Sequence, residues 1–170
     1  MRFPAEASRD VEVRYMAASC MGGFAWVTVD FEPLEGEALG MEFVNPLSPD
    51  ELWPDCASAL RQGILRRLAG VSRAGRSDDE PHMPGDEELR AGYPVLGDGD
   101  RGLIALRVVV RASRVHEVDT TASAHLRAGW RAADKGLFAA AATDDPRDRA
   151  GGAPRGTPGS AGARDVHSRG

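Results

Sequence analysis

The side chains best suited to binding chemistry gather around a single histidine. His116 and Glu117 come shortly after Arg111 and Arg114 in the chain. An imidazole can stack on a nucleobase and donate a hydrogen bond to a phosphate, and a guanidinium can hold a phosphate without reading the base sequence. The pattern is therefore compatible with RNA contact. Two plainer interpretations stay open, in which His116 caps a helix and the arginines form the solvated face of an ordinary strand.

A second candidate is the glycine-containing turn at residues 19–23. Met21, Gly22 and Gly23 interrupt the alternation of apolar and polar residues on either side. Glycine lets a backbone approach RNA closely because it has no side chain to keep the two apart. We therefore treat this turn and the segment around His116 as the two candidate binding loops.

The sequence lacks the common motifs of catalysis and cofactor binding. Residues 97–102 (GDGDRG) have the spacing of a dinucleotide-binding loop, but a strand is expected to follow where a helix is needed, and two aspartates would repel phosphate. There is no P-loop or serine-nucleophile motif, and Cys20 and Cys56 have no partners at metal-ligand spacing. We expect a protein that is not an enzyme and has no cofactor or metal. The acidic runs at 78–80 and 86–88 are expected to form a solubilising loop.

Charge and length limit the ways in which RNA could be held. The chain of 170 residues suits one domain, and its net charge of −5 argues against holding nucleic acid by electrostatics alone. Residues 103–142 carry six cations and three carboxylates, so any RNA contact is expected to be local. No segment approaches the roughly 20 apolar residues that cross a bilayer. We therefore expect a cytoplasmic protein without membrane contact.

Three strands are expected before the first helix. They lie at residues 11–16, 24–31 and 40–45, where apolar residues alternate with polar ones or β-branched and aromatic residues concentrate. Ser48, followed by Pro49 and Glu51, predicts a helix start with a capping box. The apolar stripe of this helix is expected to be Trp53, Cys56, Leu60, Ile64 and Leu68.

A fourth strand and a second helix are expected after residue 102. Alternation predicts that Arg107 and Arg111 share a cationic face of the strand, opposite a buried apolar face. Asp119 or Thr120 is expected to cap the helix. Its apolar stripe is predicted to be Leu126, Trp130, Ala133 and Leu137. We assign Trp26, Trp53 and Trp130 to the core.

The predicted order of elements is three strands, a helix, a strand and a helix. Residues 1–9 form an N-terminal extension, and residues 10–142 form the domain. A polar, proline-containing stretch at about residues 71–90 is interpreted as a disordered insertion. Residues 143–170, rich in Gly, Ala, Pro and Arg without periodicity, are interpreted as a disordered tail.

Three blocks in this order resemble the fourth domain of elongation factor G. Residues 26–34 (WVTVDFEPL) and 40–45 (GMEFVN) are similar to the "EPL … YEFVN" region of that family. Residues 90–95 (RAGYPV) resemble its "LAGYPV" step between the first helix and the fourth strand, and residues 116–121 (HEVDTT) resemble the "HEVDSS" loop that opens the second helix. The resemblance covers roughly residues 10–142.

This resemblance implies an α+β two-layer sandwich like that of a small ribosomal protein (small-subunit protein domain 2-like). In that fold a four-stranded sheet is covered by two helices, and the crossover is left-handed, which the general rule for parallel strands would not predict. The family's tip loops correspond here to His116 and its neighbours and to the turn at residues 19–23.

The resemblance also implies a function in translation. In the family this domain enters the decoding region of the small ribosomal subunit, so the implied partners are that subunit and its RNA. This chain has no GTPase motif, and a separate GTPase stays open as a partner. Where the family has Gly-Gly-Arg-Gly-Gln, residues 19–23 read SCMGG and lack the cation and the amide. The alternative is a protein-interaction or vestigial domain that has lost its translation role.

Overall fold

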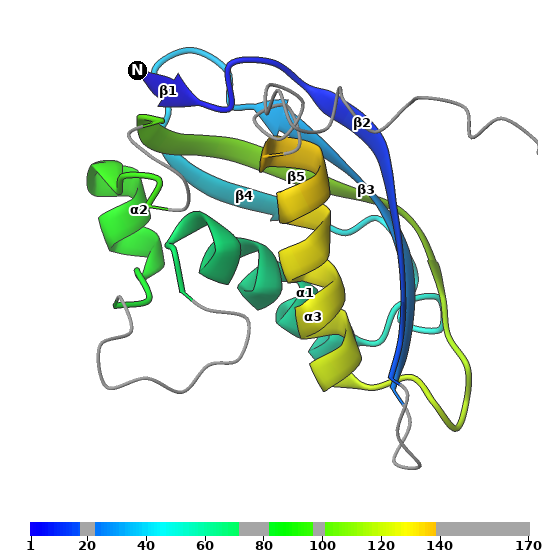
Figure 1. The fold of residues 1–170 in the computed structure, drawn as a ribbon. Coiled ribbons are helices and arrows are strands. Elements are labelled where there is room, and N and C mark those ends of the chain that lie inside the picture. The colour runs from blue at the N-terminus through cyan, green and yellow to red at the C-terminus, as the bar shows by residue number, and fades with distance from the viewer. Residues whose placement is uncertain (18–22, 72–81, 97–100, 139–170) are drawn as a thin grey trace, which may run out of the picture.

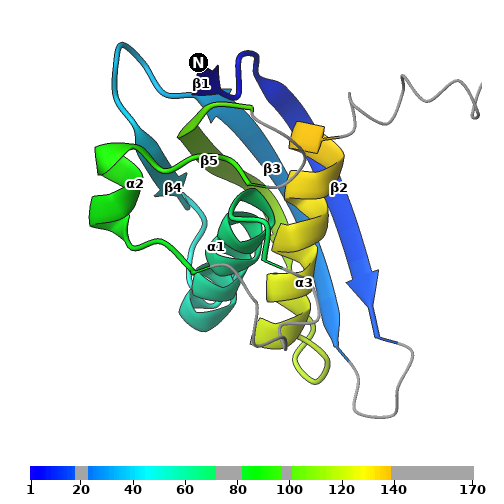
Figure 2. The same cartoon turned by 60° about the vertical axis from the view of Figure 1, so that its left-hand side comes forward.

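The computed structural model describes residues 1–17, 23–71, 82–96 and 101–138 (Figure 1). These residues form a mixed α+β fold, in which a curled five-stranded sheet is covered on one face by helices (Figure 2). The predicted tail at 143–170 lies outside the described residues. Within the described part of the chain, every helix is too short or too polar to cross a membrane.

Strand β5 (Leu103–Arg114) is the centre of the sheet. It pairs antiparallel with β3 (Phe24–Pro33) and parallel with both β4 (Gly40–Val44) and β1 (Arg2–Phe3). Strand β2 (Ser8–Met16) pairs antiparallel with β3. The predicted strands are confirmed in position. The expected four-strand count is wrong, because residues 2–3 of the predicted N-terminal extension pair with the start of β5.

Helix α1 (Pro54–Leu68) starts later than the sequence predicts. Glu51 does accept hydrogen bonds from the backbone and hydroxyl of Ser48, at 3.0 and 2.9 Å. That turn does not continue into the helix, because Pro54 restricts the residue before it to an extended conformation. Trp53 accordingly has φ −59° and ψ 144°.

The first helix and β3 form the centre of the core. Val27, Val29 and Phe31 alternate along β3 and are fully buried. The predicted stripe on α1 packs against them through Leu60, Ile64 and other residues of that face. Trp53 is only partly buried.

Helix α3 (Ala122–Ala133) continues into a π-helical turn, η1 (Asp134–Phe138). Of the predicted stripe, Ala133 and Leu137 are buried as expected. Leu126 and Trp130 are only partly buried. The buried face consists of Ala124, His125, Ala128, Gly129, Ala132 and Ala133. Small residues are needed here because a Cβ atom added at Gly129 or at Gly63 of α1 would overlap a backbone carbonyl of the other helix.

A further helix, α2 (Asp86–Gly92), falls within the predicted insertion. Its first turn is acidic, and these carboxylates lie at the positive, N-terminal end of the helix dipole. Glu88 accepts a hydrogen bond from the backbone of Gly85 at 2.8 Å. Leu89 is almost fully buried. The prediction of disorder is therefore wrong for this part, and residues 86–88 are a helix start. Residues 72–81, which include the other acidic run, lie outside the described residues.

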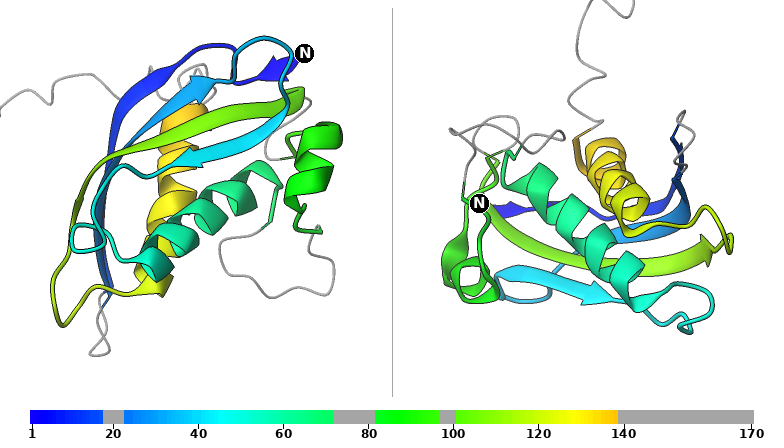
Figure 3. Two further views of the ribbon diagram at one scale, coloured as in Figure 1. Left: turned by 180° about the vertical axis from the view of Figure 1, so that it is seen from behind. Right: turned by 90° about the horizontal axis from the view of Figure 1, so that it is seen from below.

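Helices α1 and α3 lie on the same face of the sheet (Figure 2). Seen from behind, β5 passes in front of α3 (Figure 3, left). On this other side, which we call the open face, no described helix covers β2, β3 and β5. The open face carries the outward side chains of these strands and leads to the end of the sheet where β5 turns into α3.

Candidate functional site

The loop between β5 and α3 folds tightly around His116. The backbone N–H of His116 donates to Thr120 Oγ1 at 2.6 Å, and the N–H groups of Asp119 and Thr120 donate to the His116 carbonyl at 3.2 and 3.0 Å. The cap of α3 is Thr121, whose Oγ1 accepts from Ala124 N at 3.2 Å. The predicted caps, Asp119 and Thr120, are therefore wrong, because both residues serve the loop instead.

This loop lies beside the described end of the β2–β3 turn. Phe24 N donates to the Asp119 carbonyl at 2.7 Å, and Ala17 N donates to the Gly23 carbonyl at 2.9 Å. Both loops line one hollow of about 360 Å³, whose walls are Met16, Ala17, Gly23, Phe24, His116 and Asp119. The structure thus brings His116 and Gly23 together, while Met21 and Gly22 lie outside the described residues.

His116 is exposed and partly engaged. Its Nδ1 atom lies 3.1 Å from Asp119 Oδ2, and its side chain is 61% exposed. The contact with Asp119 uses only Nδ1, so the other ring nitrogen, Nε2, is the one that can face a ligand. Glu117 is also exposed. The carboxylates of Glu117 and Asp119 lower the positive charge that was expected at this end of the sheet.

Arg111 is tied to a buried carboxylate. Its Nε donates to Asp30 Oδ2 at 2.7 Å, and the Asp30 side chain is only 3% exposed. Burial by itself would raise the pKa of Asp30, but the hydrogen bond from Asp10 N at 2.7 Å, together with Arg111, outweighs burial and holds the pKa below its usual value. Arg111 therefore compensates a buried charge in the fold.

The predicted cationic face of β5 is in fact a set of ion pairs. Arg107 donates to Glu42 of β4 at 2.9 Å, just as Arg111 donates to Asp30 of β3. The pairs form because β3 and β4 are the sheet neighbours of β5 and place their carboxylates on the same face.

Arg114 differs from these arginines. Its guanidinium carbon lies 4.7 Å from the centre of the Trp26 ring, and it has no carboxylate partner within the described part of the chain. Such a cation–π contact orients the guanidinium while leaving its N–H groups free for phosphate. Arg114 is thus the predicted arginine that stays available.

Comparisons with known proteins are informative about the fold. No protein-family model matches the chain, and no curated protein matches it either. A crystal structure of a protein from Thermus thermophilus aligns with a TM-score of 0.50 and 18% sequence identity. The alignment covers 79% of this chain and 16% of that one. The likeness extends to the fold alone.

The arrangement is suited to binding. Among residues 1–17, 23–71, 82–96 and 101–138, no group of three or more His, Cys, Asp or Glu side chains could hold a metal ion. The sequence interpretation missed Trp26, which was assigned to the core but lies partly exposed on the open face. The signal was present, since the inward alternation of Ala25, Val27 and Val29 directs Trp26 outward.

Proposed function

We propose that this chain is a non-catalytic module of the elongation factor G domain IV kind that contacts the small ribosomal subunit or its RNA. One observation carries the proposal. Gly23 and Phe24, at the described end of one segment that corresponds to a family tip loop, lie beside the His116 loop at one end of the sheet, where Phe24 N donates to the Asp119 carbonyl at 2.7 Å. The proposal includes the finer fold, a ribosomal-protein-like sandwich to which β1 and α2 have been added.

The chemistry at this end supports a local contact. The exposed imidazole of His116 can stack on a base or donate to a phosphate, and Arg114 can position a phosphate. The neighbouring carboxylates Glu117 and Asp119 oppose a purely electrostatic association. Affinity would therefore come from shape and stacking at one end of the molecule, as an accessory to translation with or without a separate GTPase.

Cosedimentation with purified small ribosomal subunits over a salt series tests the proposal. The wild-type protein should pellet with the subunits at low salt, and Arg114→Ala should weaken binding and flatten the salt dependence by about one counterion. Arg107→Ala is a matched control, because the same side chain on the same strand is paired with Glu42. His116→Ala should weaken binding with little change in slope. A wild-type protein that never pellets with subunits contradicts the proposal.

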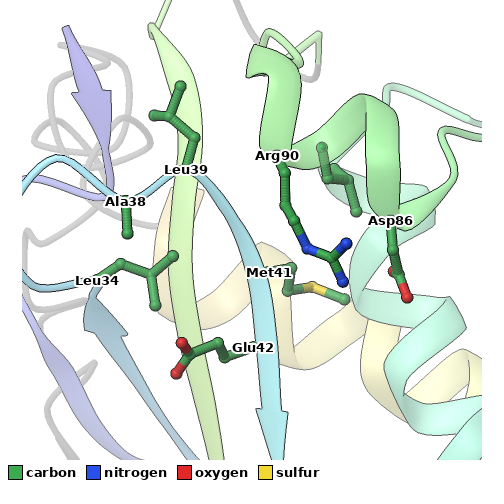
Figure 4. A pocket seen from close by; sticks show the side chains of 8 residues that line it. Leu34, Ala38, Leu39, Met41, Glu42, Asp86 and Arg90 are labelled. Carbon is green, nitrogen blue, oxygen red and sulfur yellow. The ribbon is translucent and has the colours of Figure 1, made fainter.

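A second candidate function is a protein-interaction module, which a different hollow supports. This hollow, of about 370 Å³, lies between α2 and β4 (Figure 4). Leu34, Leu39 and Met41 contribute apolar walls, and three charged side chains, Glu42, Asp86 and Arg90, also line the hollow. Such a site suits an apolar side chain of a partner protein. Two results together would replace the first function with this one. The protein would bind neither ribosomes nor RNA, and Leu39→Glu would abolish a measured protein association that His116→Ala leaves intact.

A further inference from the structure

Trp26 lies on the open face of the sheet between two arginines of neighbouring strands. Arg14 of β2 and Arg114 of β5 are its paired residues on either side. Their guanidinium carbons lie 6.0 and 4.7 Å from the centre of the Trp26 ring. We call these three side chains the tryptophan row.

Within the tryptophan row, Arg114 differs from Arg14 and from the other arginines of the open face. Arg107 and Arg111 are each held by a carboxylate of an adjacent strand, and Arg14 contacts Glu12 at 2.9 Å. Arg114 has only the indole ring as a partner among the described residues. The row therefore combines an aromatic surface with a guanidinium whose hydrogen-bond donors are unused, a pairing that binds bases and phosphates together.

The hollow at the end of the sheet continues this row along the same face. Met16 and Phe24 are paired across β2 and β3, and Met16 comes two residues after Arg14 whereas Phe24 comes two residues before Trp26. Side chains two residues apart share a face and lie about 6.6 Å apart along a strand. Met16, Phe24 and His116 line the hollow, and Met16 is 78% exposed. The Trp26 ring and the apolar hollow beside His116 are thus neighbours on the same face, separated by one two-residue repeat of the strand.

We propose that the tryptophan row and the adjoining hollow bind two successive unpaired nucleotides of single-stranded RNA. One base stacks on Trp26, the next enters the hollow beside His116, and Arg114 holds a phosphate. Base faces are accessible only in unpaired RNA, so this surface selects single strands over duplexes. Glu117 and Asp119 act in the same direction, because they disfavour the higher charge density of a duplex. This inference rests on the proposed function and specifies the form of RNA that the module takes.

Fluorescence anisotropy with a short labelled single-stranded RNA of mixed sequence tests the inference, with a hairpin of the same composition as competitor. Trp26→Leu keeps apolar bulk on the strand but removes the ring, and should weaken binding roughly tenfold. Trp26→Phe, which keeps a ring, should lose less. Arg114→Ala should weaken binding and reduce the salt slope by about 0.7, the value for one phosphate contact on a single strand. Arg107→Ala should change neither quantity.

Circular dichroism of each variant first establishes that it is folded. The inference is overturned if folded Trp26→Leu binds single-stranded RNA as tightly as wild type, if the hairpin competes equally well, or if wild type binds no single-stranded RNA. Subunit cosedimentation in the same preparations separates the two proposals. Subunit binding that persists without oligonucleotide binding leaves the proposed function standing and refutes the tryptophan row. Oligonucleotide binding that depends on Trp26, without subunit binding, supports the row and contradicts the ribosomal assignment.

Discussion

The interface between α1 and α3 and the open face of the sheet are built from opposite kinds of side chain. At the interface, Gly63 and Gly129 bring two backbones into contact, and the surrounding residues are alanines and aliphatics. On the open face, long charged side chains form ion pairs, and in the pair of Arg107 with Glu42 both side chains are partly solvated. A close-packed interface has no room for change, whereas a solvated pair can rearrange. Stability should therefore depend on the first region and binding on the second.

The largest expected loss of stability comes from adding one methyl group at the interface between α1 and α3. Gly63→Ala places its Cβ where the carbonyl of Leu126 lies, and a backbone atom cannot move aside without separating the helices. We expect a loss of about 4 kcal/mol or more in the free energy of unfolding, measured by urea denaturation. Ser58→Ala, an exposed change on the same helix, should have little effect. A Gly63→Ala protein as stable as wild type would show that the helices are further apart than described.

Replacing a large core side chain by alanine should lower the free energy of unfolding slightly less than Gly63→Ala does. The loss should depend on how deeply the side chain is buried in its helix stripe. Leu60 is fully buried, so Leu60→Ala should destabilise the protein by about 3 kcal/mol through lost contacts and a cavity. Leu126 is only partly buried, and Leu126→Ala should cost about 1 kcal/mol. Thermal and urea unfolding of both variants would measure the difference. Equal losses would restore the stripe that the sequence predicted for α3.

A pH dependence of the free energy of unfolding, of intermediate size, should come from His125. This residue is polar, unlike the other buried residues of α3. The ring is fully buried, Nδ1 lies 2.9 Å from the Thr121 carbonyl, and Nε2 has no hydrogen-bond partner among the described residues. Burial lowers the pKa of His125 below its usual value, although the Thr121 carbonyl favours the protonated form.

The unfolded chain therefore binds this proton more readily than the folded one. The free energy of unfolding should be constant well above the unfolded pKa of about 6.5 and fall as the pH drops below it, by at most about 1.4 kcal/mol per pH unit for one proton. Urea titrations across this range would measure the slope. His125→Leu should flatten it. A slope unchanged in His125→Leu would assign the effect to another group.

The smallest expected effect is on the open face. Arg107→Ala removes an ion pair whose two side chains are both partly exposed, so the loss of stability should be smaller than for any of the interface or core changes above. Unfolding at low and high salt would measure it. A loss as large as that of Leu60→Ala would contradict the division between a stabilising interface and a tolerant ion pair on the open face.

Side-chain periodicity was sufficient to predict four of the five described strands and the core of α1. The alternation around Val27 and Val29 follows from a sheet with one covered face, and that signal is local in the sequence. The start of α1 was missed because two local signals conflicted. Glu51 accepts the hydrogen bond from the Ser48 backbone that a capping box requires, but Pro54 determines where the helix begins.

Other features depended on neighbours that are distant in the sequence. Arg107 and Arg111 do not form the predicted cationic face, because they are paired with Glu42 and Asp30 of the neighbouring strands. The small-residue face of α3 was not predictable from apolar spacing, since it depends on how closely α1 approaches. For the candidate site, the position of His116 beside Gly23 matches the expectation, but its contact with RNA stays a prediction.

The pairing of β1 with β5 has a consequence for the order of folding. Arg2 and Phe3 pair with Leu103 and Ile104, about 100 residues later in the chain, and β4 also pairs with β5. Contacts between such distant parts of a chain form slowly, and a growing chain cannot make them until β5 has been synthesised. A nascent chain that ends before residue 103 would hold β2 and β3 as a ribbon without β5, and Phe31 would lack the cover that η1 gives it beside Gly136.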